Sequence, residues 1–365
     1  MKIGIISDLH LGYSRFEDDS YVQAEKMIDD ASEKTDIIIV AGDIFDSRIP
    51  KLEAIKHAVE IFKKAKVDVV AIHGNHERRT KGFENPLGVL ASAGVIKYLD
   101  SEIYEFEKNG EKISIFGIGS IPEEYAEEEI RKAVEASNIT SDAKNILVIH
   151  QNVVELVEQE GVSIDFLDKL PFDLVVNGHI HKRQVKLDGK LVVPGSTVIT
   201  QLKKDETEPK GYYIYETDSK KSEFIKMPTR KFFYEELEFT EASEKNIIES
   251  IGKKVDEIRK DHSDCIISIK LKGTLREGLK SSDIRVPTEY PMVFISNELN
   301  IIDIKEKIEE IKRIKESNMS VKEYGRRELE KRLKDKIKLF NPSELFEKLI
   351  EDSDVASEYL QEKLK

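Results

Sequence analysis

Residues 2–10 of the chain read KIGIISDLH, a short apolar run that ends in an aspartate and, two positions later, a histidine. Four further apolar runs have the same form, each rich in Ile and Val and followed within two residues by Asp or His. The five runs are 2–7, 36–41, 67–72, 145–149 and 173–177, and helical patterns at 21–34 and 52–64 separate the first three. Apolar strands that alternate with helices predict an α/β domain whose sheet is covered on both faces.

The sequence patterns of the remaining residues predict hairpins within the first domain and further segments after it. Polar turn residues at 108–110, 188–189 and 218–219 lie between alternating runs and predict β-hairpins, so antiparallel strands are expected as well. Strand patterns at 232–239, 265–271 and 292–295, with a helix at 242–260, predict a small α+β domain. We therefore expect an α/β domain at 1–230, this small domain at 231–300, a charged linker at 301–319 and C-terminal helices at 320–365.

Composition excludes several classes of protein. The 365 residues include 71 acidic and 58 basic side chains, a net charge of −13, so nucleic-acid binding would have to rest on local basic segments. No apolar run approaches the roughly 18 residues of a membrane helix, and no leader pattern precedes the first strand. The single Cys265 excludes an internal disulfide and a thiolate-only metal site. We expect a cytoplasmic protein without a membrane segment.

The side chains able to bind a metal or to catalyse a reaction concentrate at the ends of the predicted strands. The polar residues that follow the apolar runs are Asp8, His10, Asp43, Asn75, His76, His150, His179 and His181. Ligands of open α/β sheets bind in the crevice at the carboxyl ends of the strands, so one crevice would receive all of them. Residues i and i+2 of an extended segment project to one side, which pairs Asp8 with His10 and His179 with His181. Glycines before Asp43, Asn75 and His179 allow close backbone approach.

Such a ligand set suits two metal ions better than one. His76 is not counted among the ligands, which leaves seven side chains. Seven are too many for a single ion that must keep a position open, whereas two divalent ions can share a carboxylate and clamp a phosphoryl group. Carboxylate, amide and imidazole together favour Mn²⁺, with Fe, Zn or Mg²⁺ less favoured. A lone histidine after a strand is more often a packing residue, and His73 is interpreted as packing or as a support for the ligands. His57, within a helix, and His262, in a polar loop, are assigned no function. The ordered set is what predicts a metal site.

These residues, in this order, resemble the motifs of the calcineurin-like metallophosphoesterases. The motifs are Asp8-x-His10, Gly42-Asp43-x-x-Asp46, Gly74-Asn75-His76-Glu77, His150 and Gly178-His179-x-His181. The resemblance implies a two-sheet α/β sandwich flanked by helices, with two metal ions at its edge. By the family pattern one ion would take Asp8, His10 and His181, the other Asn75, His150 and His179, and Asp43 would bridge them.

Within that superfamily the chain looks like the nuclease subunits of double-strand-break repair, the archaeal and eukaryotic meiotic-recombination nuclease and its bacterial relative SbcD. The segments that carry this likeness are IISDLHLG at 5–12, IHQN at 149–152, GHIHK at 178–182 and VPGS at 193–196. The resemblance implies a manganese-dependent 3′–5′ exonuclease on duplex DNA and endonuclease on single strands. It further implies a homodimer with a DNA-binding capping domain at 231–300, whose region 320–365 binds a coiled-coil ABC-type ATPase.

Two residues would act beside the ligands. His76 is expected to be the general acid, or the residue that stabilises the transition state, at the leaving 3′ oxygen. Asp46 stands where many members of the family have histidine, and we expect its side chain to hydrogen-bond and orient His76. Basic side chains could contact the DNA backbone or simply be a solvated surface. They are Arg78, Arg79, Lys81, Lys182, Arg183, Lys203 and Lys204.

Two other functions stay open. The chain could be another metallophosphoesterase, such as a protein phosphatase or small phosphodiesterase, although such enzymes need neither the extra domain nor the helical tail. It could be a scaffold that tethers DNA ends without cutting them, although the complete ligand set argues against this. The tail, basic over 322–338 and acidic over 344–362, could dock on its own chain instead of a partner. Helices near 52–64 and 87–93 are the expected dimer surface.

Overall fold

The computed structural model describes residues 1–80, 82–137, 139, 142–276, 279, 284, 290–299, 323, 326, 341–351, 356–357 and 359–360. The predicted linker at 301–319 and nearly all of the basic segment at 322–338 lie outside these residues, as does Lys81. The chain divides into two compact units. The first holds Met1–Glu235 with Lys253–Ile269 and Thr288–Phe294, and the second holds the remaining described residues.

The first sheet of the larger unit has the strand order β12-β11-β1-β2-β3-β4. Its bounds are β1 Lys2–Ile6, β2 Ile37–Ala41, β3 Val69–Ile72, β4 Lys97–Tyr98, β11 Gly211–Glu216 and β12 Lys221–Lys226. Strands β1 to β4 pair in parallel, with Ile3 opposite Ile37, and β11 adds to β1 in antiparallel register. The carboxyl ends of β1, β2 and β3 therefore lie side by side.

The second sheet has the order β5-β6-β7-β8-β10-β9. Its bounds are β5 Glu102–Lys108, β6 Glu111–Gly117, β7 Lys144–Ile149, β8 Leu174–Asn177, β9 Gln184–Lys186 and β10 Leu191–Val193. Strands β6, β7, β8 and β10 are parallel to one another, whereas β5 and β9 are antiparallel edge strands. The hairpin between β5 and β6 turns at Asn109 and Gly110, both with positive φ, as the turn residues predicted.

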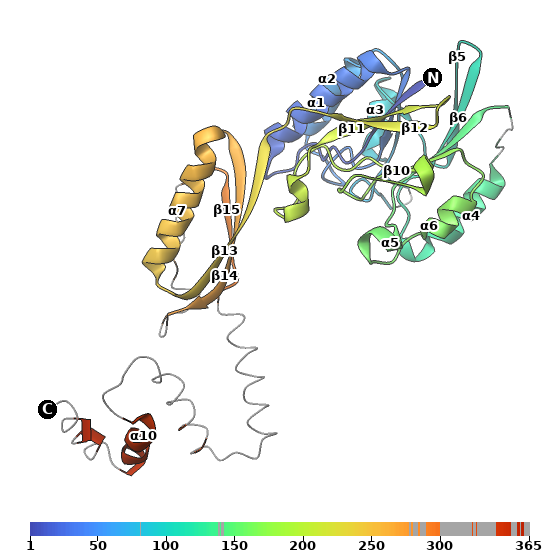
Figure 1. Cartoon of the computed structure of the whole chain (residues 1–365). Helices are drawn as coiled ribbons and strands as arrows, with labels where there is room; N and C mark the ends of the chain where they lie inside the picture. Colours follow the sequence, from blue (N-terminus) through green and yellow to red (C-terminus); the bar gives the residue numbers. More distant parts are fainter. Residues whose placement is uncertain are drawn as a thin grey trace. The chain divides into compact units, whose positions relative to one another are not determined.

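Alternation along the strands builds a layered sandwich. Ile37 and Ile39 of β2 point into a core shared with Ile146 and Val148 of the second sheet. The intervening residues of β2 point outward, against helices α1 (Glu17–Lys34), α2 (Leu52–Lys63) and α3 (Pro86–Ser92). Helices α4 (Ala126–Ala136), α5 (Val154–Val157) and α6 (Ile164–Lys169) lie on the far side of the second sheet (Figure 1). The predicted two-sheet α/β sandwich flanked by helices is confirmed.

Helix boundaries follow local chemistry. Helix α1 begins at Glu17, earlier than predicted, and carries Glu17, Asp18 and Asp19 in its first turn, where the helix dipole favours negative charge. Helix α4 was not predicted from the sequence because its apolar positions are few. Its buried residues Ala126, Ile130 and Val134 are spaced by four within a segment rich in charged residues.

The later elements are β13 (Lys231–Ala242), α7 (Glu244–Asp261), β14 (Cys265–Leu275), β15 (Val293–Asn297) and α10 (Pro342–Glu351). Strands β13, β14 and β15 form a three-stranded sheet in that order. Helix α10 begins with Pro342, where proline costs no hydrogen bond. Short 3₁₀ turns occur at η1 (Glu123–Tyr125), η2 (Leu187–Gly189) and η3 (Lys204–Thr207). Among the described helices, none has the length and apolar character needed to span a bilayer.

Candidate metal centre

The predicted site residues lie in loops that leave the carboxyl ends of strands in both sheets. Asp8 and His10 follow β1, Asp43 follows β2, Asn75 and His76 follow β3, His150 follows β7, and His179 and His181 follow β8. The structure brings these loops together. Three overlapping groups form, Asp8–His10–His181, His10–Asp43–His76 and Asp43–His150–His179, and within each the ligand atoms lie within 4.8 Å of one another.

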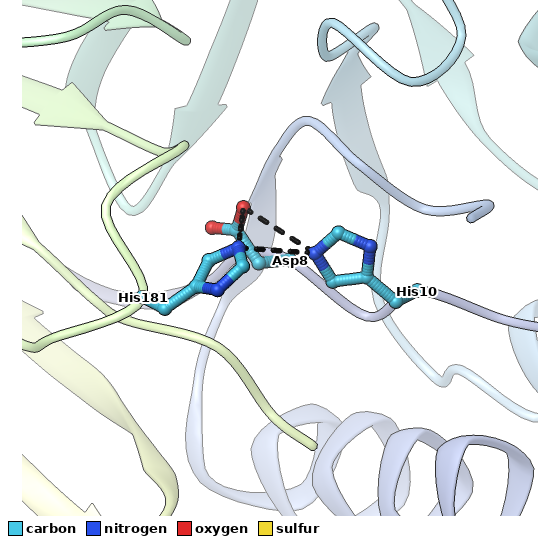
Figure 2. A group of neighbouring side chains, drawn as sticks. All are labelled: Asp8, His10 and His181. Carbon is cyan, nitrogen blue, oxygen red and sulfur yellow. Dashed lines mark hydrogen bonds and ion pairs between the residues drawn. The ribbon is translucent and has the colours of Figure 1, made fainter. Parts of the chain in front are cut away.

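The first group is built from the loops after β1 and β8. Asp8 Oδ1 lies 3.9 Å from His10 Nε2 and 3.7 Å from His181 Nε2 (Figure 2). The two Nε2 atoms are 3.2 Å apart. His10 Nδ1 faces the Asp46 carboxylate at 3.2 Å, so its other nitrogen is free to turn inward.

A second set of donors, His150 and His179, gathers around Asn75, which belongs to none of the three groups above. Its Oδ1 lies 3.1 Å from His150 Nε2 and 2.9 Å from His179 Nδ1. His150 is anchored from behind, because its Nδ1 donates to the Ala41 carbonyl at 2.7 Å. An amide oxygen and two ring nitrogens therefore converge on one point.

Asp43 lies between the two groups. Its Oδ2 is 3.3 Å from His150 Nε2 and 3.9 Å from His10 Nε2. Its Oδ1 accepts a hydrogen bond from the His76 backbone N–H at 3.0 Å. One carboxylate thus faces both groups, which is the geometry required of a bridging ligand.

The donors present fit a pair of divalent cations. Asp8 Oδ1 is buried and has no hydrogen-bond partner among the residues that the structure describes. A buried carboxylate oxygen without a partner is costly unless a cation neutralises it. The facing nitrogens of His10 and His181 likewise need a proton or a cation between their lone pairs. Carboxylate, amide and imidazole together suit borderline ions such as Mn²⁺.

The charge balance of the site points the same way. Burial alone would raise the pKa of Asp43, but the nearby histidines, His150 first and then His10, together outweigh burial and hold that pKa below its ordinary value. Burial alone would lower the pKa of His150, but Asp43 and then Asp8 raise it to about 10. The carboxylates therefore draw a proton onto His150 at neutral pH, and a divalent cation would supply the same compensation.

The two histidines after β8 are neutral. Burial, and then the charge of His150, lowers the pKa of His179 to about 4. Burial, and then His10, holds the pKa of His181 well below its ordinary value. Neutral imidazoles are the form that binds metals.

The backbone at the site is not extended, so one step of the sequence reasoning was wrong. Asp8, His10, Asp43 and His179 have φ values of 55°, 47°, 50° and 72°. Non-glycine residues rarely adopt this left-handed conformation, and such strain gathers at functional sites. The side chains of Asp8 and His10 do meet, but through two tight turns held by hydrogen bonds from Asp8 N to Gly42 O and from His10 N to Asp43 O.

The glycines before the ligands are required by close approach. A Cβ on Gly74 would lie 2.0 Å from Asp43 Oδ1, and one on Gly42 would lie 2.3 Å from His150 Nδ1. A Cβ on Gly178 would lie 1.9 Å from the Ala41 carbonyl oxygen. Any larger residue would therefore push the ligand loops apart.

The structure revises the expectation for Asp46. His76 Nδ1 lies 2.9 Å from the Asp46 backbone carbonyl, to which it donates, and 3.6 Å from the nearest oxygen of its carboxylate. The carboxylate instead makes its shorter contact, 3.2 Å, with His10 Nδ1. Asp46 thus orients His76 through its main chain and His10 through its side chain, because Nδ1 of His10 lies nearer the carboxylate.

Sequence reasoning missed the residues that support the ligands. Glu77 is fully buried and accepts from the backbone N–H groups of Phe45 at 2.6 Å and Gly74 at 2.7 Å, which ties the loops after β2 and β3 together. Burial, and then Asp43, raises its pKa to about 8. Its place directly after His76 in the motif was the available signal. Thr200 and Glu206, which lie behind His181, had no signal in the sequence.

Basic residues surround the site unevenly. Lys182 lines a cavity of about 380 Å³ together with His76, His179 and His181. Arg78 lines a second cavity of about 760 Å³ and has no ion pair within the described part of the chain. Arg183 is occupied otherwise, since its guanidinium stacks on Phe224 at 4.2 Å.

Comparison with known proteins gives consistent results. The family model for calcineurin-like phosphoesterases matches residues 1–183. The double-strand break repair protein MRE11 of Encephalitozoon cuniculi is 29% identical over 256 residues, which cover 59% of this chain and 45% of that protein. The DNA double-strand break repair proteins Mre11 of Methanocaldococcus jannaschii and Methanococcus maripaludis are 32% and 33% identical, covering 57% and 59% of this chain and 60% and 62% of those proteins. The chain thus spans about half to three fifths of these relatives.

Proposed function

The chain belongs to the calcineurin-like phosphoesterase family, and we propose that within it the protein is a DNA nuclease of double-strand-break repair with two divalent metal ions. The names of the Mre11 relatives from three organisms support the choice of substrate. Such a role would place the protein with chromosomal DNA. Manganese is the ion we favour, because imidazole supplies so many of the donors.

One observation carries the proposal: two sets of donors converge on neighbouring points with a shared carboxylate. Asp8, His10 and His181 would hold one ion, and Asn75, His150 and His179 the other, with Asp43 between them. When bound, the pair would supply an activated water and neutralise the charge that develops on the phosphoryl oxygens of a phosphodiester.

His76 is the residue best placed to serve the leaving group. Its Nδ1 donates to the Asp46 carbonyl, and its Nε2 makes no hydrogen bond to the described part of the chain. Its side chain is 36% exposed and lines the same cavity as His179 and His181. A positioned imidazole beside the scissile bond can donate a proton to the departing 3′ oxygen.

Local positive charge supports binding of a DNA backbone despite the acidic chain. Lys182 lines the site cavity and follows the ligands after β8, whereas Arg78 lines a second cavity and follows those after β3. Contacts from such residues to phosphates position a strand and carry no sequence information. We propose that they hold the strand that is cut.

Further parts of the proposal concern assembly. We propose that residues 231–300 cap the nuclease domain on DNA and that the protein is a homodimer through α2 and α3, where Leu52 is 80% and Val89 42% exposed. Region 320–365 would bind a coiled-coil ABC-type ATPase. Within its described part, α10 buries Leu345 against Tyr359 but leaves Leu349 and Ile350 about half exposed. An amphipathic helix with a free apolar edge suits a partner groove.

The test is digestion of end-labelled duplex and single-stranded DNA with Mn²⁺, Mg²⁺ or a chelator, with and without the ATPase. We expect manganese-dependent shortening of duplex DNA from the 3′ end and internal cleavage of single strands. Hydrolysis of small phosphate esters without DNA cleavage would favour another phosphoesterase. Binding of DNA ends by metal-free protein, without cleavage in any metal, would favour a scaffold.

A further inference from the structure

A buried chain of polar residues lies behind His181. The Thr200 hydroxyl, in the loop after β10, is 2.5 Å from His181 Nδ1 and 2.9 Å from Glu206 Oε1. Glu206 in η3 forms an ion pair with Lys210 through its other oxygen. Glu206 is 6% and Lys210 8% exposed, so the pair is shielded from water. Lys210 also donates to Ser196 at 2.8 Å.

The direction of each hydrogen bond in this chain follows from the donors available. Glu206, paired with Lys210, is a carboxylate and can only accept. Its Oε1 also faces the backbone N–H groups of Thr200 at 3.3 Å and Gln201 at 3.2 Å. The single hydroxyl proton of Thr200 therefore goes to Glu206. The hydroxyl oxygen must then accept from His181, which places the proton of that ring on Nδ1.

This arrangement decides which nitrogen His181 offers to the site. With the proton on Nδ1, the Nε2 lone pair faces Asp8 Oδ1 at 3.7 Å and His10 Nε2 at 3.2 Å (Figure 2). In the opposite tautomer an N–H would occupy that point. A hydrogen bond to the outer nitrogen is how proteins fix the tautomer of a histidine that binds a metal.

We propose that Thr200, Glu206 and Lys210 are a positioning relay that fixes the tautomer of His181 and thereby sets the affinity of the metal position formed by Asp8, His10 and His181. The inference rests on the proposed two-metal site and goes beyond its ligands. Loss of a supporting group of this kind typically weakens metal binding about 10–100-fold. The effect should be confined to this position, because the group around Asn75 has its own anchor in the bond from His150 to Ala41.

The variant that isolates the relay is Thr200→Val, which keeps the shape of the side chain and removes the oxygen that accepts from His181. Glu206 keeps Lys210 and both backbone donors, so the loop retains most of its bonds. Thr200→Ser restores the hydroxyl. Thr207→Val is the matched control, because its hydroxyl is exposed and donates only to Lys204 O at 2.7 Å. If the Thr200→Val protein does not fold, Thr200→Ala replaces it in the experiment.

The experiment is a Mn²⁺ titration of the full chain without DNA, by calorimetry and electron paramagnetic resonance. We expect two ions in the wild type, Thr200→Ser and Thr207→Val, and one of two affinities weakened 10–100-fold in Thr200→Val. In metal-free protein labelled with ¹⁵N-histidine, His181 should carry its proton on Nδ1 in the wild type and lose this preference in Thr200→Val. A merely structural role would not move that signal.

The relay is overturned if Thr200→Val binds both ions as tightly as the wild type, weakens both equally, or is not rescued by serine. It is also overturned if the wild-type tautomer has its proton on Nε2. A wild-type chain that binds no pair of ions would instead refute the metal site of the proposed function, which separates the two failures.

Discussion

Substitution of Gly178 by alanine should damage the site more than its single methyl group would indicate. A Cβ at this position would lie 1.9 Å from the Ala41 carbonyl oxygen and 2.5 Å from both His150 Nδ1 and Ser7 Oγ. Ordinary contact between carbon and a carbonyl oxygen needs about 3.3 Å. The ends of β2 and β8 must therefore separate by more than an ångström. The bond from His150 to Ala41 would not survive this separation, because it spans the same gap.

The expected cost follows from these contacts. Overpacking a closed interior costs ~1–3 kcal/mol, and the lost hydrogen bond adds ~1 kcal/mol. We expect Gly178→Ala to lower the free energy of unfolding by about 3 kcal/mol, which corresponds to a fall in melting temperature of roughly 6–12 °C for a domain of this size. Binding of Mn²⁺ at the position that includes His150 should weaken at least about tenfold, since its anchor is displaced.

Urea unfolding and a Mn²⁺ titration measure both effects, and the matched control is Gly94→Ala. Gly94 has a φ of 72° and no neighbour within 4 Å of an added Cβ, so alanine there brings backbone strain of ~1–2 kcal/mol without a clash. The control should lose a little stability and bind both ions normally. A Gly178→Ala protein with wild-type stability and two tightly bound ions would refute the reasoning.

Further predictions concern other parts of the molecule. His76→Ala should abolish DNA cleavage while both ions remain bound, and loss of metal would instead make His76 a ligand. Lys210→Met should destabilise the fold by ~3 kcal/mol because it leaves Glu206 buried without its cation, and calorimetry that finds no change would contradict this. Partial burial acts to raise the pKa of Asp36, but the hydrogen bonds from the Lys108 side chain and the Lys2 backbone N–H, with the charge of Lys108, together lower that pKa. The contribution of the Asp36 carboxylate to folding stability should be complete above its unfolded pKa of about 3.9. It should vanish as the pH falls through the lower pKa of the folded state. Asp36→Asn should thus lower the free energy of unfolding by less than ~1 kcal/mol at pH 7 and leave it unchanged in strong acid. An equal loss at the two pH values would contradict this prediction. Truncation after residue 319 should spare intrinsic nuclease activity and abolish ATPase binding, and a truncated chain that still captures the ATPase would show that the tail serves only its own chain.

The ligand positions could be predicted because strand ends are visible in a sequence. An apolar run such as 36–41 must be buried, and parallel pairing then brings Asp43 beside the residues that end neighbouring strands. The pattern could not predict that Asp8 and His10 reach the site through left-handed turns, since backbone conformation at a loop depends on contacts such as that between His10 N and Asp43 O.

Supporting residues were harder to predict because their partners are distant in the chain. Thr200 and Glu206 support His181 through a loop whose sequence resembles ordinary polar surface. The role of Asp46 was predicted for the wrong atom, because only the structure shows that its carbonyl, and not its carboxylate, lies nearest His76. Helix α4 escaped prediction for a related reason, since few of its side chains are buried.

The central claim is that loops from two sheets gather donors for a pair of cations. Anomalous diffraction from crystals soaked in manganese chloride, recorded at the manganese edge, tests it most directly. We predict two peaks, one beside Asp8 and His181 and the other beside Asn75 and His150, with Asp43 between them. A map without peaks at these positions, or with one peak far from Asp43, would contradict the claim.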